Sequence, residues 1–199
     1  MDLQTLADKT LVERSNLNLG EIFTHLTDIS TGAWNDVLNI EGCGNYQFLS
    51  ALMKTLKPRV VVELGGAMGV GTLMMLANAD KECQIYSITL EEGGLEFSFI
   101  KKKYPNLHLI VGNDLDMENW PKDMQWEKVD FLYIDSKHTK EQLKQELDLY
   151  LPILKKGTII AIDDIYLNDG MKKVWNMIYY HKIDLTKECH WSGWGLVSL

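Results

Sequence analysis

The sequence predicts a single α/β domain built on a doubly wound, mostly parallel sheet of seven strands, with an antiparallel hairpin at its C-terminus. Three observations lead to this fold class. Short apolar runs rich in β-branched residues alternate with longer helix-like segments, which indicates βαβ units. The runs are apolar throughout, as in strands covered on both faces of a parallel sheet. The last 18 residues, 182–199, instead form two strand-like runs joined around Ser192-Gly193.

The elements follow in chain order. Residues 1–45 are expected to form a helical N-terminal segment that could act as a lid, and residues 46–199 the α/β domain. Five parallel strands are predicted at residues 59–64, 84–88, 107–111, 129–134 and 158–162. The clearest helix follows the fourth strand, where Thr139 and Gln142 have the spacing of a capping box. One apolar face of this helix is predicted to contain Leu143, Leu147, Tyr150, Leu151 and Leu154.

Composition excludes several classes of protein. The chain has 199 residues, with 20 Lys and Arg against 28 Asp and Glu, and a formal net charge of −8. Its only arginines are Arg14 and Arg59, so a nucleic-acid partner is not expected, because such proteins present basic stripes to phosphates. The sequence shows neither a signal-peptide pattern nor an apolar run of about 20 residues, and we therefore expect a cytoplasmic protein without a membrane partner.

A glycine-rich loop follows the first predicted strand, in the segment Glu63-Leu64-Gly65-Gly66-Ala67-Met68-Gly69. Glycines let the backbone turn sharply and approach a ligand, and the helix that follows offers free N–H groups. The dinucleotide fingerprint GxGxxG is not matched, because Ala67 stands at its second glycine, and the phosphate-binding P-loop is not matched, because no lysine precedes Thr72. The carboxylate of Glu63 suits a cationic or hydroxyl-bearing ligand better than a pyrophosphate.

With this loop the sequence resembles the class I S-adenosylmethionine-dependent methyltransferases, whose first motif reads E/D-x-G-x-G-x-G. The resemblance covers about residues 45–199 and implies S-adenosylmethionine as the cofactor. Thr89 stands where the family has an acidic residue for the ribose, so Glu91 or Glu92 would have to reach back. The cofactor-binding residues that the resemblance implies are Glu63, Gly65, Gly66, Ala67, Gly69, Thr89, Glu91, Asn113, Asp114 and Asp135.

Three carboxylates end the fourth and fifth predicted strands, namely Asp135, Asp163 and Asp164. The carboxyl ends of neighbouring parallel strands share one edge of the sheet, and carboxylates this close raise one another's pKa unless a cation holds them. Oxygen ligands favour a hard cation such as Mg²⁺. The alternative is that each aspartate only caps a helix or satisfies loop N–H groups. The remaining histidines, His25, His108, His181 and His190, show no spacing typical of metal binding.

The segments around these aspartates, 134–138 and 162–164, resemble the small-molecule O-methyltransferases of the catechol/caffeoyl and macrocin types, and also the cephalosporin-hydroxylase-like branch. The resemblance implies that Asp135, Asp163 and Asp164 bind magnesium and that the enzyme methylates a hydroxyl group of a small molecule. His138 matches the position of the general base in the catechol type, where it is a lysine. Lys137 matches a position that is acidic in the macrocin type, so both residues remain candidates for the base.

Two other classes of function stay open. One is an NAD(P)-dependent oxidoreductase on a similar sheet, against which the unmatched GxGxxG fingerprint argues. The other is a non-catalytic cofactor-binding module, which the departures at Ala67 and Thr89 would favour. The expected partner is a small molecule that carries a hydroxyl group, and a homo-oligomer is also allowed.

Overall fold

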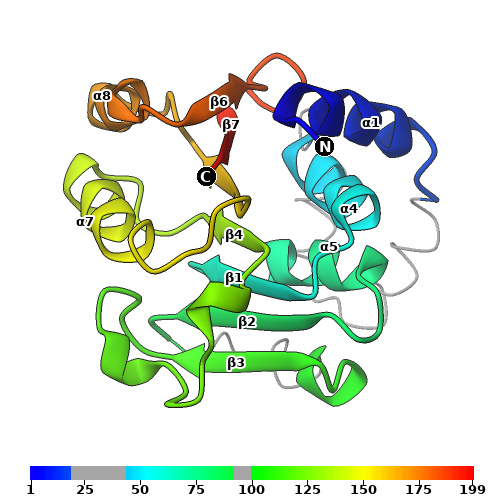
Figure 1. Cartoon of the computed structure of the whole chain (residues 1–199), viewed down its shortest axis with the longest axis vertical. Helices are drawn as coiled ribbons and strands as arrows, with labels where there is room; N and C mark the ends of the chain where they lie inside the picture. The colour runs from blue at the N-terminus through cyan, green and yellow to red at the C-terminus, as the bar shows by residue number, and fades with distance from the viewer. Residues whose placement is uncertain (19–43, 92–99) are drawn as a thin grey trace.

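A seven-stranded sheet runs through the middle of the computed structural model, which describes residues 1–18, 44–91 and 100–199 (Figure 1). The strand order is β3-β2-β1-β4-β5-β7-β6. Strands β1 to β5 pair in parallel, whereas β7 runs antiparallel to both β5 and β6. The strands are β1 (Val60–Leu64), β2 (Gln84–Thr89), β3 (Leu107–Val111), β4 (Phe131–Ile134), β5 (Ile159–Asp163), β6 (His181–Asp184) and β7 (Trp194–Ser198). The predicted fold class, with its C-terminal antiparallel hairpin, is confirmed.

Helices cover both faces of the sheet. Figure 1 shows α1 (Leu3–Ser15), α4 (Gly44–Leu56) and α5 (Val70–Asn78) on one side, and α7 (Lys140–Tyr150) and α8 (Asp169–Met177) on the other. Side chains alternate between the faces of a strand, so Val61 belongs to the core under the first group of helices and its neighbour Val62 to the core under the second. The central strands β4 and β5 are therefore apolar at nearly every position, which explains their continuous apolar runs.

The parallel register aligns the strand ends that carry the glycine loop and the aspartates. Leu64, the last residue of β1, pairs with Ile88 of β2 and with Ile134 of β4. Ile134 pairs in turn with Ile162 of β5. The loops that follow β1, β2, β4 and β5 consequently leave the sheet side by side, at the edge where open α/β sheets bind their ligands.

The helix predicted after β4 is present, but two details differ. Thr139 is its N-cap and accepts from the backbone N–H of Gln142, whereas the Gln142 side chain does not complete the capping box and donates to Asp114 instead. The helix ends at Tyr150, because Pro152 has no N–H with which to continue it. The predicted positions Leu151 and Leu154 thus lie in the following turn, where both still pack against the core.

The N-terminal segment contributes one described helix, α1, whose residues Leu3 and Leu6 are buried in the same core as α4 and α5. The expected boundary at residues 45 and 46 falls inside α4. Residues 19–43, on which the expectation of a lid largely depends, and Glu92 lie outside the described residues. Within residues 1–18, 44–91 and 100–199, each helix lacks the length and apolar character that crossing a membrane requires.

Candidate active site

The glycine loop makes a tight turn between β1 and α5. The backbone N–H groups of Gly65 and Gly66 both donate to the carbonyl oxygen of Ile88, each at 3.0 Å. Gly65 has φ +92°, and a Cβ atom there would overlap the backbone carbonyl of Asp135, so only glycine fits. Ala67 has φ 40°, the left-handed region that favours glycine. Alanine at the motif's middle glycine therefore still adopts a glycine-like backbone.

A cavity of about 690 Å³ opens beside this loop, at the carboxyl ends of β1 to β4. Its size is within the range of small-molecule sites. Among the residues predicted for the cofactor, those that line the cavity are Gly65, Ala67, Thr89, Glu91, Asn113, Asp114 and Asp135. Glu63, Gly66 and Gly69 are not part of its lining.

Glu63 lies beneath the glycine loop and is only 1% exposed. Its carboxylate accepts hydrogen bonds from Ser87 Oγ at 2.5 Å and from the Thr72 hydroxyl, and so connects β1 with β2 and α5. Burial raises the pKa of Glu63 to about 7, although both hydrogen bonds act in the opposite direction. The structure thus places Glu63 as a buried support of the loop, and its direct role in cofactor binding stays a prediction.

A polar network closes the cavity on the side of β3. Asp114 accepts from Gln142 Nε2 at 2.9 Å, and the same amide donates to Glu146 Oε1 at 2.9 Å. The Ser136 hydroxyl also donates to Glu146 Oε1. Burial raises the pKa of Glu146 to about 8, with a further contribution from the charge of Asp114, and both effects favour the protonated form of this carboxyl group.

No motif in the sequence predicts that Glu146 and Gln142 belong to this region. The sequence does contain an indication that Glu146 is buried, because this residue follows Leu143 by three positions and precedes Tyr150 by four. It therefore shares the apolar face of α7. A charged residue on a buried face is informative, since burying it requires partners or a neutral state.

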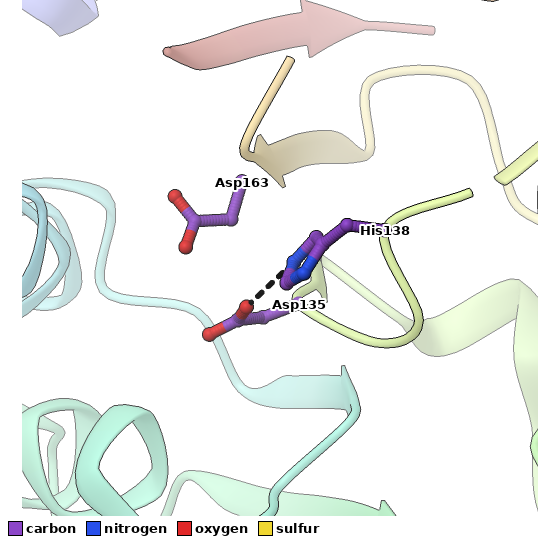
Figure 2. A group of neighbouring side chains, drawn as sticks. All are labelled: Asp135, His138 and Asp163. Carbon is purple, nitrogen blue, oxygen red and sulfur yellow. Dashed lines mark hydrogen bonds and ion pairs between the residues drawn. The ribbon is translucent and has the colours of Figure 1, made fainter. Parts of the chain in front are cut away.

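The three predicted metal ligands lie at the carboxyl ends of β4 and β5, where His138 is close to both Asp135 and Asp164. Figure 2 shows His138 joined to Asp135 by one interaction, with Asp163 beside them at the end of β5. His138 Nε2 lies 3.2 Å from Asp135 Oδ1, and His138 Nδ1 lies 3.4 Å from Asp164 Oδ2. The hydroxyl of Tyr133 donates to Asp135 Oδ2 at 3.0 Å. Asp135 therefore belongs both to this cluster and to the wall of the cavity.

A second histidine, His190, reaches the same aspartates from the connection between β6 and β7. Its Nε2 lies 2.7 Å from Asp163 Oδ1, and its Nδ1 lies 2.7 Å from Ser192 Oγ. No spacing along the chain indicates this placement. The available signal is topological: β7 pairs with β5, so that Asp163 lies opposite Trp194, and the residues just before Trp194 must pass the end of β5.

Charges within the cluster shift the pKa values of its members. Burial and the neighbouring charge of Asp163 raise the pKa of Asp135 to about 6, although the hydrogen bonds from His138 and Tyr133 oppose this shift. Burial alone would lower the pKa of His138. The hydrogen bond to Asp135 and the charges of Asp135, Asp164 and Asp163 outweigh it, and the pKa of His138 is raised. The pKa of His190 is raised for the same reasons, with Asp163 as its main partner.

The cluster offers oxygen and nitrogen donor atoms of the kinds that bind divalent cations. One ligand atom from each of Asp135, His138 and Asp163 lies within 4.8 Å of the others, and the same holds for Asp163, Asp164 and His190. The three predicted metal residues thus fall into two groups that share Asp163, each with one imidazole, and their role in metal binding stays a prediction. Of the two candidates for the base, His138 is inside the cluster, whereas Lys137 is exposed and lines the cavity.

The seven-stranded sheet with its antiparallel end is the fold of methyltransferases of known structure. Residues 62–165 match the model of a family described as a methyltransferase domain. Because this match spans more than half of the chain, the chain belongs to that methyltransferase family. The family favours the methyltransferase prediction over the oxidoreductase alternative. No curated protein matches the sequence.

Solved structures show the same fold at low sequence identity. A candidate caffeoyl-CoA O-methyltransferase from Staphylococcus aureus superposes with a TM-score of 0.64 at 16% identity, covering 89% of this chain and 97% of its own. An O-methyltransferase from Bacillus cereus, solved with S-adenosylhomocysteine, has a TM-score of 0.60 at 15% identity, covering 96% and 90%. Fibrillarin from Aeropyrum pernix, solved with bound S-adenosylmethionine, has a TM-score of 0.59 at 15% identity, covering 78% and 76%.

Proposed function

We propose that this protein transfers a methyl group from S-adenosylmethionine to a hydroxyl group of a small molecule, assisted by a divalent metal ion for which Mg²⁺ is the starting candidate. One observation carries the proposal. Asp135 belongs at the same time to the wall of the cavity beside the glycine loop and to the cluster with His138 and Asp163. A cofactor in the cavity and an acceptor at the cluster would therefore lie next to each other.

The cavity suits S-adenosylmethionine in its lining residues and in charge. Apolar side chains of Met68, Ile88 and Leu90 line it together with the polar groups of Asn113 and Asp114, a combination that fits a purine and its ribose. The sulfonium of the cofactor carries a positive charge, which the carboxylate of Asp135 favours. The Bacillus cereus and Aeropyrum pernix structures of the same fold bind S-adenosylhomocysteine and S-adenosylmethionine, respectively.

The cluster suits a hydroxyl acceptor. Asp135, Asp163 and Asp164 would hold the metal ion, which when bound lowers the pKa of a coordinated hydroxyl group. The acceptor oxygen forms a bond to the methyl carbon while the bond from that carbon to the cofactor sulfur breaks, leaving S-adenosylhomocysteine. The hydroxyl proton goes to His138, whose protonated ring the surrounding carboxylates stabilise.

Two measurements test this proposal. Calorimetry should show that S-adenosylhomocysteine binds and NAD⁺ does not. A panel of catechols, sugars and other hydroxyl compounds, assayed with S-adenosylmethionine labelled in its methyl group, should then yield a methylated product whose formation EDTA suppresses. Binding of NAD⁺ alone would favour the oxidoreductase. Tight binding of S-adenosylhomocysteine with no turnover across the panel would favour the non-catalytic module.

A further inference from the structure

We propose that His190 supplies a nitrogen ligand to the cation held by Asp163 and Asp164. The site would then bind first-row transition-metal dications, such as Co²⁺, Ni²⁺ or Zn²⁺, in preference to Mg²⁺. This inference rests on the metal site of the proposed function. It adds a residue that the three-carboxylate assignment leaves out, and it changes the class of metal.

The position of His190 fits that of a ligand. One donor atom from each of Asp163, Asp164 and His190 lies within 4.8 Å of the other two, and Nε2 of His190 lies 2.7 Å from Asp163 Oδ1. The side chains of His190 and Asp163 are only 12% and 7% exposed. Neighbouring ligands of a six-coordinate ion with bonds of about 2.1 Å are roughly 3 Å apart, which is close to the separation of these two atoms.

The hydrogen bond on the other side of the ring orients His190. Its Nδ1 lies 2.7 Å from the hydroxyl of Ser192, a buried residue, and 3.9 Å from Asp164 Oδ1, beyond hydrogen-bond reach. When Nδ1–H donates to Ser192 Oγ, Nε2 can bind a metal ion in place of the proton that it shares with Asp163 Oδ1. Histidines that bind metals typically donate their second ring N–H to a fixed oxygen in this way.

The backbone fixes this arrangement against the end of β5. The N–H of Tyr166 donates to the carbonyl oxygen of Ser192 at 2.7 Å, and the N–H of Ile165 donates to that of Gly193 at 3.3 Å. Gly193 itself has φ +97°, and a Cβ atom there would meet the side chains of Ile165 and Tyr166. The turn that carries His190 and Ser192 is therefore held directly against the residues that follow Asp164.

His138 differs from His190 in its partners. Both ring nitrogens of His138 face carboxylates, Nε2 toward Asp135 at 3.2 Å and Nδ1 toward Asp164 at 3.4 Å. His190 instead has one carboxylate partner, Asp163, and one hydroxyl partner, Ser192, within hydrogen-bond distance. The hydroxyl can hold one ring nitrogen while the other faces the metal site, so His190 is the better placed nitrogen ligand.

A nitrogen donor changes which metal the site prefers. Mg²⁺ binds oxygen ligands and water, and it gains little from an imidazole, whereas Co²⁺, Ni²⁺ and Zn²⁺ bind mixed nitrogen and oxygen sets well. Affinity for such sites also rises from Co²⁺ to Ni²⁺ along the first transition row. We therefore expect the full chain, stripped of metal, to bind Co²⁺ at least about tenfold more tightly than Mg²⁺.

The test measures metal binding rather than activity. Calorimetry and the visible absorption of Co²⁺ are recorded for the wild-type chain, for His190→Gln and for His181→Gln, which replaces an exposed histidine at the start of β6. His190→Gln should weaken Co²⁺ binding at least about tenfold and alter its spectrum, while Mg²⁺ binding changes less than about twofold. His181→Gln should change neither. His190→Asn serves as a second variant if thermal unfolding shows that the first is not folded.

The outcomes separate this inference from the proposed function. If Asp163→Asn abolishes Co²⁺ binding and His190→Gln leaves its affinity and spectrum unchanged, the role of His190 is overturned and the three-carboxylate site stands. If the wild-type chain binds neither Co²⁺ nor Mg²⁺, the metal site of the proposed function fails as well. If the wild-type chain binds Mg²⁺ as tightly as Co²⁺, the preference for transition metals is overturned.

Discussion

Asp163 and His190 are 27 positions apart in the chain, yet Asp163 Oδ1 and His190 Nε2 lie 2.7 Å from each other. They meet because β7 is inserted between β5 and β6, so that the residues before β7 pass the carboxyl end of β5. Asp163 also lies within ligand distance of Asp135 and His138. This one carboxylate therefore joins both groups of candidate ligands, and it is the residue whose removal should be most informative.

Asp163→Asn should weaken binding of a divalent metal by at least about 100-fold. Replacing a residue that only hydrogen-bonds to a metal ligand already lowers metal affinity by up to about 100-fold, and Asp163 is proposed as a ligand itself. Calorimetry with the metal ion measures the effect. Binding of S-adenosylhomocysteine should change little, since Asp163 does not line the cavity. Asp148→Asn is the matched control, because Asp148 is an exposed carboxylate on α7 that pairs with Lys144. Methyl transfer that persists in Asp163→Asn and in the presence of EDTA would refute the metal requirement.

His138→Gln should lower kcat by about 100- to 10,000-fold, the contribution of a positioned general base. Lys137→Gln should lower it much less, because Lys137 is exposed and lies outside the cluster. The base acts only when unprotonated, and the pKa of His138 is raised above 6.5. In the wild-type enzyme kcat/KM should thus fall as the pH drops through that raised pKa, and His138→Gln should remove this limb. A larger loss in Lys137→Gln would assign the base to Lys137.

Gly65→Ala and Gly157→Ala should differ sharply in stability, although their φ angles are nearly equal, at +92° and +91°. Alanine in this region costs roughly 1–2 kcal/mol at either position. At Gly65 the added Cβ would also overlap the backbone of Asp135, whereas at Gly157 it meets nothing within 4 Å. Urea unfolding should show a loss for Gly65→Ala that is at least about 2 kcal/mol larger, a typical cost of overpacking. Equal losses would mean that the loop can relax.

Ala67→Gly should stabilise the protein by up to about 1 kcal/mol, because it removes the left-handed strain at φ 40° and adds only the smaller entropy of glycine in the unfolded chain. Ala79→Gly is the control. Ala79 has φ −72°, where alanine is unstrained, so this substitution should destabilise the protein by about 0.4–1 kcal/mol. Unfolding in urea compares the two variants, and a loss of stability in both would contradict the strain at Ala67.

Glu146→Gln should change how stability depends on pH. The folded protein binds a proton at Glu146 up to a pKa of about 8, whereas the unfolded chain releases it near the ordinary pKa of 4.5. Between these values the folded state holds more protons, so stability falls as the pH rises, by at most about 1.4 kcal/mol per pH unit from this group. A glutamine side chain cannot ionise, and the slope measured by urea unfolding between pH 5 and pH 8 should become flatter. An unchanged slope would show that Glu146 is ionised when folded.

Much of the fold could be predicted from local patterns. The predicted strand at 107–111 matches β3 in both bounds, and the run at 84–88 falls one residue short of β2. The end of α7 is harder to predict from the sequence, because the apolar face continues to Leu154 while Pro152 stops the hydrogen bonding of the helix. Hydrophobic periodicity reports which residues are buried, and it does not report where the backbone hydrogen bonds end.

In the candidate site, too, some residues can be predicted from local patterns and others cannot. Asp135, Asp163 and Asp164 could be predicted because each directly follows or ends an apolar strand, a position that any parallel sheet sends to one edge. His190 and Glu146 could not be found by motif spacing, since their partners come from other elements. The capping-box spacing predicts that the Gln142 side chain caps the helix, but the Gln142 amide donates to the nearby carboxylate of Asp114, a charged acceptor.

By itself, the sequence determined the class of fold and the edge of the sheet that carries the site, because burial on both faces of a strand and the turn after it are local properties of the chain. The tertiary structure decided what surrounds the aspartates. The insertion of β7 beside β5 brought His190 to Asp163, and the packing of α7 buried Glu146 beside Asp114. Such contacts depend on the order in which the strands pair, and no spacing of residues along one chain encodes that order directly.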